Sequence, residues 1–258
     1  MRAERAGGGG CHPGCIEPST SEACDLPDWL DFRRRLFPSC NFTWVRGPRP
    51  VLIDSGFGTD LEATEAMLPG EPSLLLNTHW HSDHVGGNAG LAARHGLPIA
   101  ASIAEGTRVN ARDPEAFGAD WFDQPVDTYR VDRLLEEGEV VDTGATRLRV
   151  IAAAGHSPGQ IALFEERSRV LIAGDAILAR DIGFINPFLD GPGALEAAIA
   201  TVERIGRLEP RLAVTGHDRV IEDVAGCVRR SLERLVGWRE DPAGWPCTAA
   251  AGSSASRS

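Results

Sequence analysis

The 258-residue sequence has no excess of basic residues and no long apolar run. It carries 26 Lys and Arg against 37 Asp and Glu, which gives a formal net charge of −11. Binding to nucleic acid depends on neutralisation of phosphates by Lys and Arg, so this balance argues against a nucleic-acid partner. No apolar run reaches the length that spans a bilayer, and the first residues lack the apolar core of a signal peptide. We therefore expect a cytoplasmic protein without a membrane partner.

Cysteine and tyrosine are also scarce, with six Cys and a single Tyr, Tyr129. The cysteines lie mostly near the two ends of the chain, and we predict free thiols rather than a disulfide framework. Residues 1–25 and 241–258 are rich in Gly, Pro, Ser or Ala and are expected to be a disordered leader and tail. Residues 26–240 then form one domain with a substantial core.

Short apolar runs alternate with helical patterns inside this domain, which predicts a mixed α/β layered fold. The segments predicted as strands are 50–56, 73–79, 97–102, 146–153, 160–166, 169–175 and 211–218. The segments predicted as helices are 61–68, 88–96, 195–208 and 224–236. Thr59 and Glu62 have the spacing of a capping box for the first helix.

Four side chains that can bind a metal lie close together in residues 77–88, NTHWHSDHVGGN: His79, His81, Asp83 and His84. Residues two apart in an extended segment point the same way, so His79 and His81 can share one ion. Residues three or four apart share a face where the chain turns into a helix, so Asp83 and His84 can serve a second ion. The stretch therefore predicts part of a metal site.

Further ligands are required, and they follow three predicted strands. His156 lies in AAAGHSPGQ, Asp175 in LIAGDAIL and His217 in LAVTGHDR. One such residue alone is more often an ordinary hydrogen-bonded core residue. A whole series of them at strand-to-loop junctions favours a shared metal site instead. His95 is predicted to be a residue at a helix C-terminus rather than a ligand.

The order HxHxDH, GHSPG, GD and GH over roughly residues 40–220 resembles the metallo-β-lactamase fold hydrolase superfamily. The resemblance implies an αββα four-layer sandwich with the metals at one edge between two sheets. It assigns His79, His81 and His156 to the first metal. It assigns Asp83, His84 and His217 to the second metal, with Asp175 bridging. Asp54 matches a strand-end aspartate that orients a ligand from outside the coordination sphere.

The resemblance implies two divalent ions, with Zn²⁺ expected and Fe or Mn left open by the His/Asp ligand set. A hydroxide formed from metal-bound water would attack a polarised carbonyl, and the second metal would stabilise the oxyanion. Asp83 is the catalytic candidate, because it could also carry a proton to the leaving group.

Differences between this sequence and known branches of the superfamily indicate to which branch the chain belongs. True β-lactamases of the superfamily typically carry Cys or Ser where this chain has Asp175. Glyoxalase II-like thioesterases share the seven ligands but add a C-terminal helical domain, whereas 41 residues follow His217 here. Lactonases share the ligand set and use a tyrosine, for which only Tyr129 is available. A classical glyoxalase II is therefore not expected, but a thioesterase with another acyl carrier is, and the chain is predicted to belong to the glyoxalase II-like or lactonase-like branch.

The stretch between His84 and His156 is longer than one crossover requires, and residues 105–137 are predicted to be a helical insertion. Trp121 and Phe122 would form an apolar wall or lid there, or pack the insertion onto the body. Arg180 and Asn186 are predicted polar contacts to the substrate.

These residues together predict a di-metal hydrolase of a small-molecule acyl bond, thioester or lactone. The alternative is a mononuclear iron dioxygenase of the persulfide type. Phosphodiesterase or β-lactamase-like activity ranks below both, the former because of the acidic charge. The substrate and the oligomeric state stay open at this point.

Overall fold

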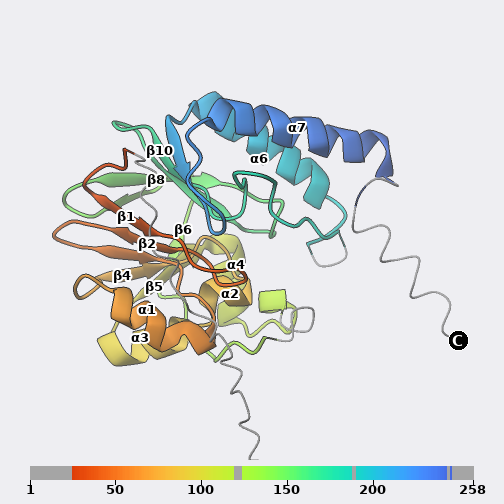
Figure 1. Cartoon of the computed structure of the whole chain (residues 1–258). Helices are drawn as coiled ribbons and strands as arrows, with labels where there is room; N and C mark the ends of the chain where they lie inside the picture. Colours follow the sequence, from red (N-terminus) through yellow and green to blue (C-terminus); the bar gives the residue numbers. More distant parts are fainter. Residues whose placement is uncertain (1–24, 119–123, 188–189, 243–244, 246–258) are drawn as a thin grey trace, which may run out of the picture.

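The computed structural model describes residues 25–118, 124–187, 190–242 and Trp245. Two β-sheets lie face to face, and helices cover the outer face of each sheet (Figure 1). Each sheet therefore hides one face against the other sheet and one against helices, as a layered domain requires. The αββα sandwich that the sequence predicted is confirmed.

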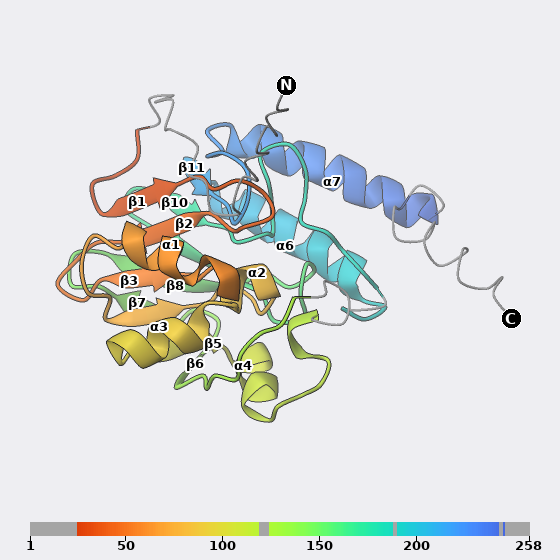
Figure 2. The same ribbon diagram turned by 60° about the horizontal axis from the view of Figure 1, so that its bottom comes forward.

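The first sheet has six strands in the order β1-β2-β3-β4-β5-β6. Its strands are β1 Leu30–Arg33, β2 Phe42–Val45, β3 Val51–Ile53, β4 Leu74–Leu76, β5 Ile99–Ser102 and β6 Arg133–Leu135. β3 to β6 pair in parallel, while β1, β2 and β3 pair antiparallel. Figure 2 shows its helical layer, formed by α1 Leu61–Met67, α2 Ser82–Val85, α3 Asn88–His95 and α4 Ile103–Asn110. Two 3₁₀ turns, η1 Gly58–Asp60 and η2 Ala116–Gly118, complete this half.

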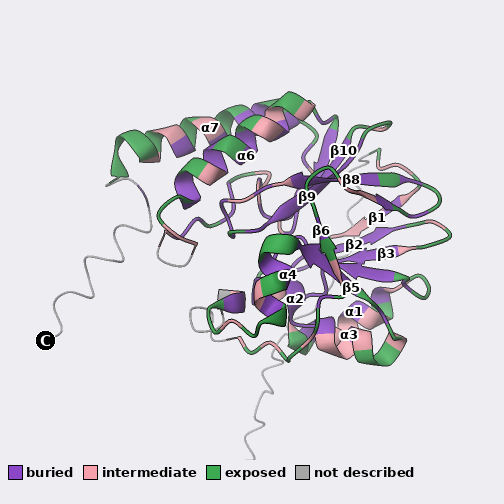
Figure 3. Ribbon diagram, turned by 180° about the vertical axis from the view of Figure 1, so that it is seen from behind, coloured by how far each residue is buried: buried purple, intermediate pink, exposed green. Residues whose placement is uncertain are grey.

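The second sheet has five strands in the order β11-β10-β9-β8-β7. Its strands are β7 Val140–Asp142, β8 Arg147–Ala152, β9 Ile161–Glu165, β10 Val170–Ile172 and β11 Leu212–Val214. Two long helices, α6 Ala194–Leu208 and α7 Val224–Glu240, cover its outer face. Their exposed residues face solvent, whereas β9 and β10 of the sheet beneath them are buried throughout (Figure 3).

β9 shows why the strand sequences are continuously apolar. Ile161 and Leu163 belong to the core between the two sheets. Ala162 and Phe164 point the other way and belong to the core under α6 and α7. Side chains alternate along a strand, so a strand covered on both faces needs apolar residues at every position.

Residues 105–137 differ from the helical insertion that the sequence predicted. The span begins inside α4 and contains η2, but it ends in β6, which pairs in parallel with β5. Part of the span therefore belongs to the first sheet. The predicted capping box is wrong: Asp60 precedes α1, without a side-chain capping bond, because residues 58–60 already form a 3₁₀ turn.

Two cysteines fall within the described residues, Cys40 and Cys227, and both are buried free thiols. Among the helices of the described part of the chain, none is long and apolar enough to cross a membrane.

Candidate metal centre

The seven predicted ligands lie at the ends of strands from both sheets. His79, His81, Asp83 and His84 follow β4 and enter the short helix α2. His156 follows β8, Asp175 follows β10 and His217 follows β11. The structure brings all seven side chains together in three overlapping donor clusters.

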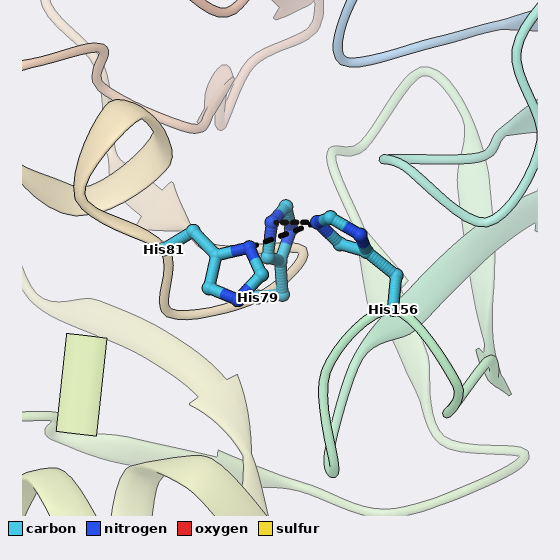
Figure 4. A group of neighbouring side chains, drawn as sticks. All are labelled: His79, His81 and His156. Carbon is cyan, nitrogen blue, oxygen red and sulfur yellow. Dashed lines mark hydrogen bonds between the residues drawn. The ribbon is translucent and has the colours of Figure 1, made fainter. Parts of the chain in front are cut away.

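The first cluster contains His79, His81 and His156, all of them buried. Nε2 of His156 lies 2.8 Å from Nδ1 of His81 and 3.1 Å from Nε2 of His79, as Figure 4 shows. Ligand nitrogens around a tetrahedral zinc ion, with bonds of about 2.0–2.1 Å, are about 3.3 Å apart. The three nitrogens therefore converge at nearly the spacing that one ion requires.

The second cluster contains Asp83, His84 and His217. Nε2 of His217 lies 2.9 Å from Oδ2 of Asp83 and 3.4 Å from Nε2 of His84. Nε2 of His84 lies 3.5 Å from Oδ2 of Asp83. These donors form a second convergent set beside the first.

Asp175 lies between the two clusters. Its Oδ2 is 3.6 Å from Nε2 of His156 and 3.4 Å from Nε2 of His217. Its Oδ1 is 3.6 Å from Nε2 of His84, and with His79 and His84 it forms a third cluster. The carboxylate thus reaches donors on both sides, as the predicted bridging position requires.

Hydrogen bonds from outside the clusters fix the orientation of two imidazoles. Oδ2 of Asp54 accepts a hydrogen bond from Nδ1 of His84 at 2.8 Å. The same carboxylate is held by the backbone N–H of Thr78 at 2.8 Å and by its hydroxyl at 2.7 Å. Nδ1 of His156 donates to the carbonyl of Phe184 at 2.6 Å. In both histidines Nε2 is left facing the cluster, and such partners typically tune a metal ligand.

The electrostatics of the first cluster favour neutral ligands. Burial, reinforced by the neighbouring histidines, holds the pKa of His79 and of His81 well below its usual value. Burial also lowers the pKa of His156, against the pull of Asp175. The imidazoles are therefore neutral at neutral pH, which is the form that binds metals.

The second cluster is dominated by carboxylates. Burial opposes a charge on His84, but Asp83, Asp175 and Asp54 raise its pKa well above the usual value. Burial would raise the pKa of Asp175, yet His217 and His84 hold it below its usual range. Buried carboxylates that stay ionised give this cluster its affinity for cations.

The donor chemistry fits divalent metal ions. Five imidazoles and two carboxylates converge, and the two carboxylates lie where positive charge is stabilised. Sets of this kind accept zinc, iron and manganese, so they indicate divalent ions without identifying the metal.

Aromatic residues near the centre include some that the sequence did not single out. The ring of Phe37 is 83% exposed and meets the ring of His217 edge-on, with centroids 5.7 Å apart. Phe184, whose carbonyl holds His156, is also exposed. Nothing in the motif spacing marks either residue, because only the fold brings them to the ligands.

The other predicted substrate contacts have separate outcomes. Trp121 and Phe122 lie outside the described residues. Arg180 is exposed. Asn186 is buried, its backbone N–H donates to the carboxylate of Asp190, and its carbonyl accepts from the backbone N–H of Asp190. Contact of either residue with a substrate stays a prediction. Tyr129 packs with Phe117 against the core beneath the first sheet.

Comparisons with known proteins find hydroxyacylglutathione hydrolases among the relatives. A hydroxyacylglutathione hydrolase of Brucella anthropi is 27% identical over 142 residues, which cover 54% of this chain and 47% of that protein. One of Acidiphilium cryptum is 27% identical over 188 residues, which cover 71% of this chain and 66% of that protein. The chain thus spans about half the length of the Brucella relative.

Solved structures show the same fold. A metallo-beta-lactamase family protein of Thermus thermophilus matches with a TM-score of 0.67 at 24% identity, over 82% of this chain and 80% of that one. The protein TTHA1623, solved in a di-iron-bound form, matches with a TM-score of 0.62 at 27% identity, over 76% of this chain and 96% of that one.

The family model described as the metallo-beta-lactamase superfamily matches residues 36–217. That span is more than half of the chain and contains all seven candidate ligands. The protein therefore belongs to the metallo-β-lactamase superfamily.

Proposed function

We propose that the protein is a di-metal hydrolase, with zinc as the expected ion, that cleaves a small-molecule acyl thioester. The observation that carries this proposal is the overlap of three donor clusters, which share His79 and His84 and place Asp175 between them. One ion would leave part of this donor set unused. Relatives that are hydroxyacylglutathione hydrolases support the class of bond, an acyl group carried by a thiol.

Divalent ions bound by these side chains supply a nucleophile from water at neutral pH and polarise the acyl carbonyl. His79, His81 and His156 would hold the first ion, and Asp83, His84 and His217 the second, with Asp175 bridging. Oδ2 of Asp83 is 2.9 Å from Nε2 of His217, and the Asp83 side chain is 19% exposed. We propose that Asp83 accepts a proton from the attacking water and passes it to the departing thiolate.

Phe37 and Phe184 supply apolar surface for the acyl group. They are two of the few large apolar side chains exposed within the described residues. Both are tied to candidate ligands, Phe37 through its ring and Phe184 through its carbonyl. An acyl chain against these rings loses contact with water, which favours binding.

A lactone is the second candidate substrate, because the ligand set suits any activated acyl carbonyl. The position of Tyr129, the only tyrosine in the sequence, weighs against it, since its ring packs on Phe117 and against the apolar core beneath the first sheet. The net charge of −11 weighs against a phosphodiester substrate and a nucleic-acid partner. The free thiols of Cys40 and Cys227 support a cytoplasmic setting.

Metal content and a substrate panel test the proposal together. Protein purified without added metal should contain about two zinc ions per chain. It should hydrolyse an acyl glutathione or acyl coenzyme A thioester faster than a γ-lactone, a β-lactam or an aryl phosphodiester. Asp175→Asn should abolish the activity. One iron per chain with oxygen uptake on a glutathione persulfide would replace the proposal by the dioxygenase alternative.

A further inference from the structure

Glu105 is a buried acid outside the candidate metal centre. It lies in the first turn of α4, after Ser102, whose hydroxyl caps the helix by accepting from the Glu105 backbone N–H. The residue is only 2% exposed. A carboxyl group buried to this degree is costly unless its oxygens are hydrogen-bonded. Its partners therefore indicate why it is there.

The partners of the Glu105 carboxyl come from two loops, one from each sheet. Oε1 accepts from the hydroxyl of Ser157 and from the backbone N–H of Gly159, the latter at 3.1 Å. The backbone N–H of Trp80 also lies near the carboxyl, where it lowers the pKa of the acid. Trp80 follows β4 of the first sheet, whereas Ser157 and Gly159 follow β8 of the second. One side chain thus joins the two halves of the sandwich.

These two loops carry the first donor cluster. Trp80 lies between His79 and His81, and Ser157 comes directly after His156. Gly159 allows the close approach, because a Cβ there would lie 2.8 Å from Cγ of Glu105 and 2.8 Å from Cβ of Ala104. Gly159, the last residue of GHSPG, thus packs against α4 beside the Glu105 carboxyl.

We propose that Glu105 is a positioning residue that holds His156 in place against His79 and His81 through hydrogen bonds to Ser157 and Gly159. The inference rests on the proposed binding of an ion by these three histidines. A metal site needs its ligands placed to within about 0.5 Å, and supporting hydrogen bonds provide that precision. The Glu105 carboxyl ties together the backbones from which the ligands project.

Three variants separate this role from simple helix stability. Glu105→Ala removes every bond of the carboxyl. Glu105→Gln keeps an oxygen for Ser157 and Gly159 but places an NH₂ group near the N–H of Trp80. Burial raises the pKa of Glu105 to about 8, so the neutral amide alters the hydrogen bonding more than the charge. Ser102→Ala is the matched control, because it weakens the same helix end and leaves the carboxyl intact.

Zinc titration of the metal-free proteins against a chromophoric chelator, with the visible spectrum of the Co²⁺ form, provides the readout. Glu105→Ala should weaken binding at the first site about 10–100-fold, as loss of outer supports does, and change the Co²⁺ spectrum. Glu105→Gln should fall between Glu105→Ala and the wild type. Ser102→Ala should bind as the wild type does, and the ion held by Asp83, His84 and His217 should be retained throughout.

Wild-type affinity and spectrum in folded Glu105→Ala would overturn the inference. If that variant fails to fold, wild-type binding by both Glu105→Gln and Ser157→Ala would overturn it instead, because each removes part of the link. A wild-type protein that binds no divalent ion would overturn the proposed function as well, and this outcome is distinguishable from the others.

Discussion

Asp54 determines which nitrogen of His84 faces the second cluster. Its carboxylate accepts from Nδ1 of His84 and is itself held by Thr78, so Nε2 is the nitrogen available to a metal ion. In Asp54→Asn the amide NH₂ group would face the Nδ1–H of His84. This contact favours the tautomer whose proton is on Nε2, the nitrogen that a metal ion needs. The backbone there has φ of 59°, which Asn tolerates as Asp does. Zinc titration should show the second ion bound about 10–100-fold more weakly.

Asp132→Asn is the control for this change. Asp132 also accepts from a backbone N–H at a strand end, that of Ile99, and lies away from the three donor clusters. Its variant should bind both ions normally. Equal affinities in the two variants would contradict an orienting role for Asp54.

Phe37 provides a test of substrate binding that leaves the metals in place. Its ring is exposed beside His217 and contributes no donor atom. Phe37→Ala should raise KM for an acyl thioester about fivefold, the effect of losing about 1 kcal/mol of apolar contact, with kcat nearly unchanged. Steady-state kinetics check this, and Leu36→Ala, at another exposed apolar residue, should leave KM as it is. A KM unaffected by Phe37→Ala would place the acyl group elsewhere.

Ligand residues that lie close together in the sequence, or beside glycines at strand ends, could be predicted from the sequence. His79, His81, Asp83 and His84 are close in sequence, and the glycines beside His156 and His217 mark strand ends. Phe37 and Glu105 could not be predicted in this way. An exposed phenylalanine and a helical glutamate are unremarkable in sequence, and only long-range contacts give them a position near the ligands.

At the scale of elements, α6 and the loop that carries His156 are in contact at Gly155. This glycine has φ of 139°, and a Cβ there would lie 2.6 Å from Cα of Ala198. Gly155→Ala must push α6 away from the sheet. We expect an unfolding free energy lower by about 1–3 kcal/mol, the usual cost of overpacking, with weaker binding of the first ion.

Gly138→Ala separates this clash from backbone strain. Gly138 also has a positive φ, 82°, but a Cβ there meets nothing within 4 Å. Urea denaturation should therefore show a smaller loss for Gly138→Ala, without any change in metal affinity. If the two variants lost the same unfolding free energy, the destabilisation of Gly155→Ala would come from its positive φ alone.

α3 is tied to the region around α1 by His95, which is a surface ion-pair residue rather than a metal ligand. Its Nδ1 lies 2.8 Å from Glu71 and its Nε2 lies 2.9 Å from Glu65. The hydrogen bond to Glu71, aided by Glu65, raises the pKa of His95. The protonated His95 therefore stabilises the native state. This stabilisation is fully present below the pKa of the unfolded chain, about 6.5, and is lost as pH rises through the pKa of the folded protein.

His95→Gln should therefore lower the urea midpoint more at pH 6 than at pH 9, relative to wild type. Arg94→Gln is the control, because Arg94 pairs with Glu65 but does not titrate in this range. Its deficit should be the same at both pH values. A His95→Gln deficit that is independent of pH would contradict the assignment.

Strands with long apolar runs could be predicted, and short edge strands could not. β3, β4, β5 and β9 are buried on both faces, so their sequences are continuously apolar. β6 and β7 have three residues each and expose one of them. These two edge strands lack the continuous apolar sequence that marks β3 and β4, which are equally short, and their pairing is determined by the neighbouring strand.

For the whole molecule, the ligands connect the two halves of the sandwich. Removal of the ions with a chelator should lower Tm by about 8–16 °C, if they are normally present near a thousandfold excess over Kd. Differential scanning fluorimetry with and without chelator measures this. The double variant His156→Ala, His217→Ala should show no response to chelator. A wild-type Tm that is equally insensitive would mean that the ions add nothing to stability.

Every donor cluster draws on both sheets, and this has a kinetic consequence. In each cluster at least one ligand follows β4 of the first sheet, and at least one follows a strand of the second. No cluster is complete until the sheets have docked, so an ion cannot assist either half to form. It therefore acts on the rate of unfolding rather than the rate of folding. Loss of the ion shortens the lifetime of the native state while the chain folds as fast as before.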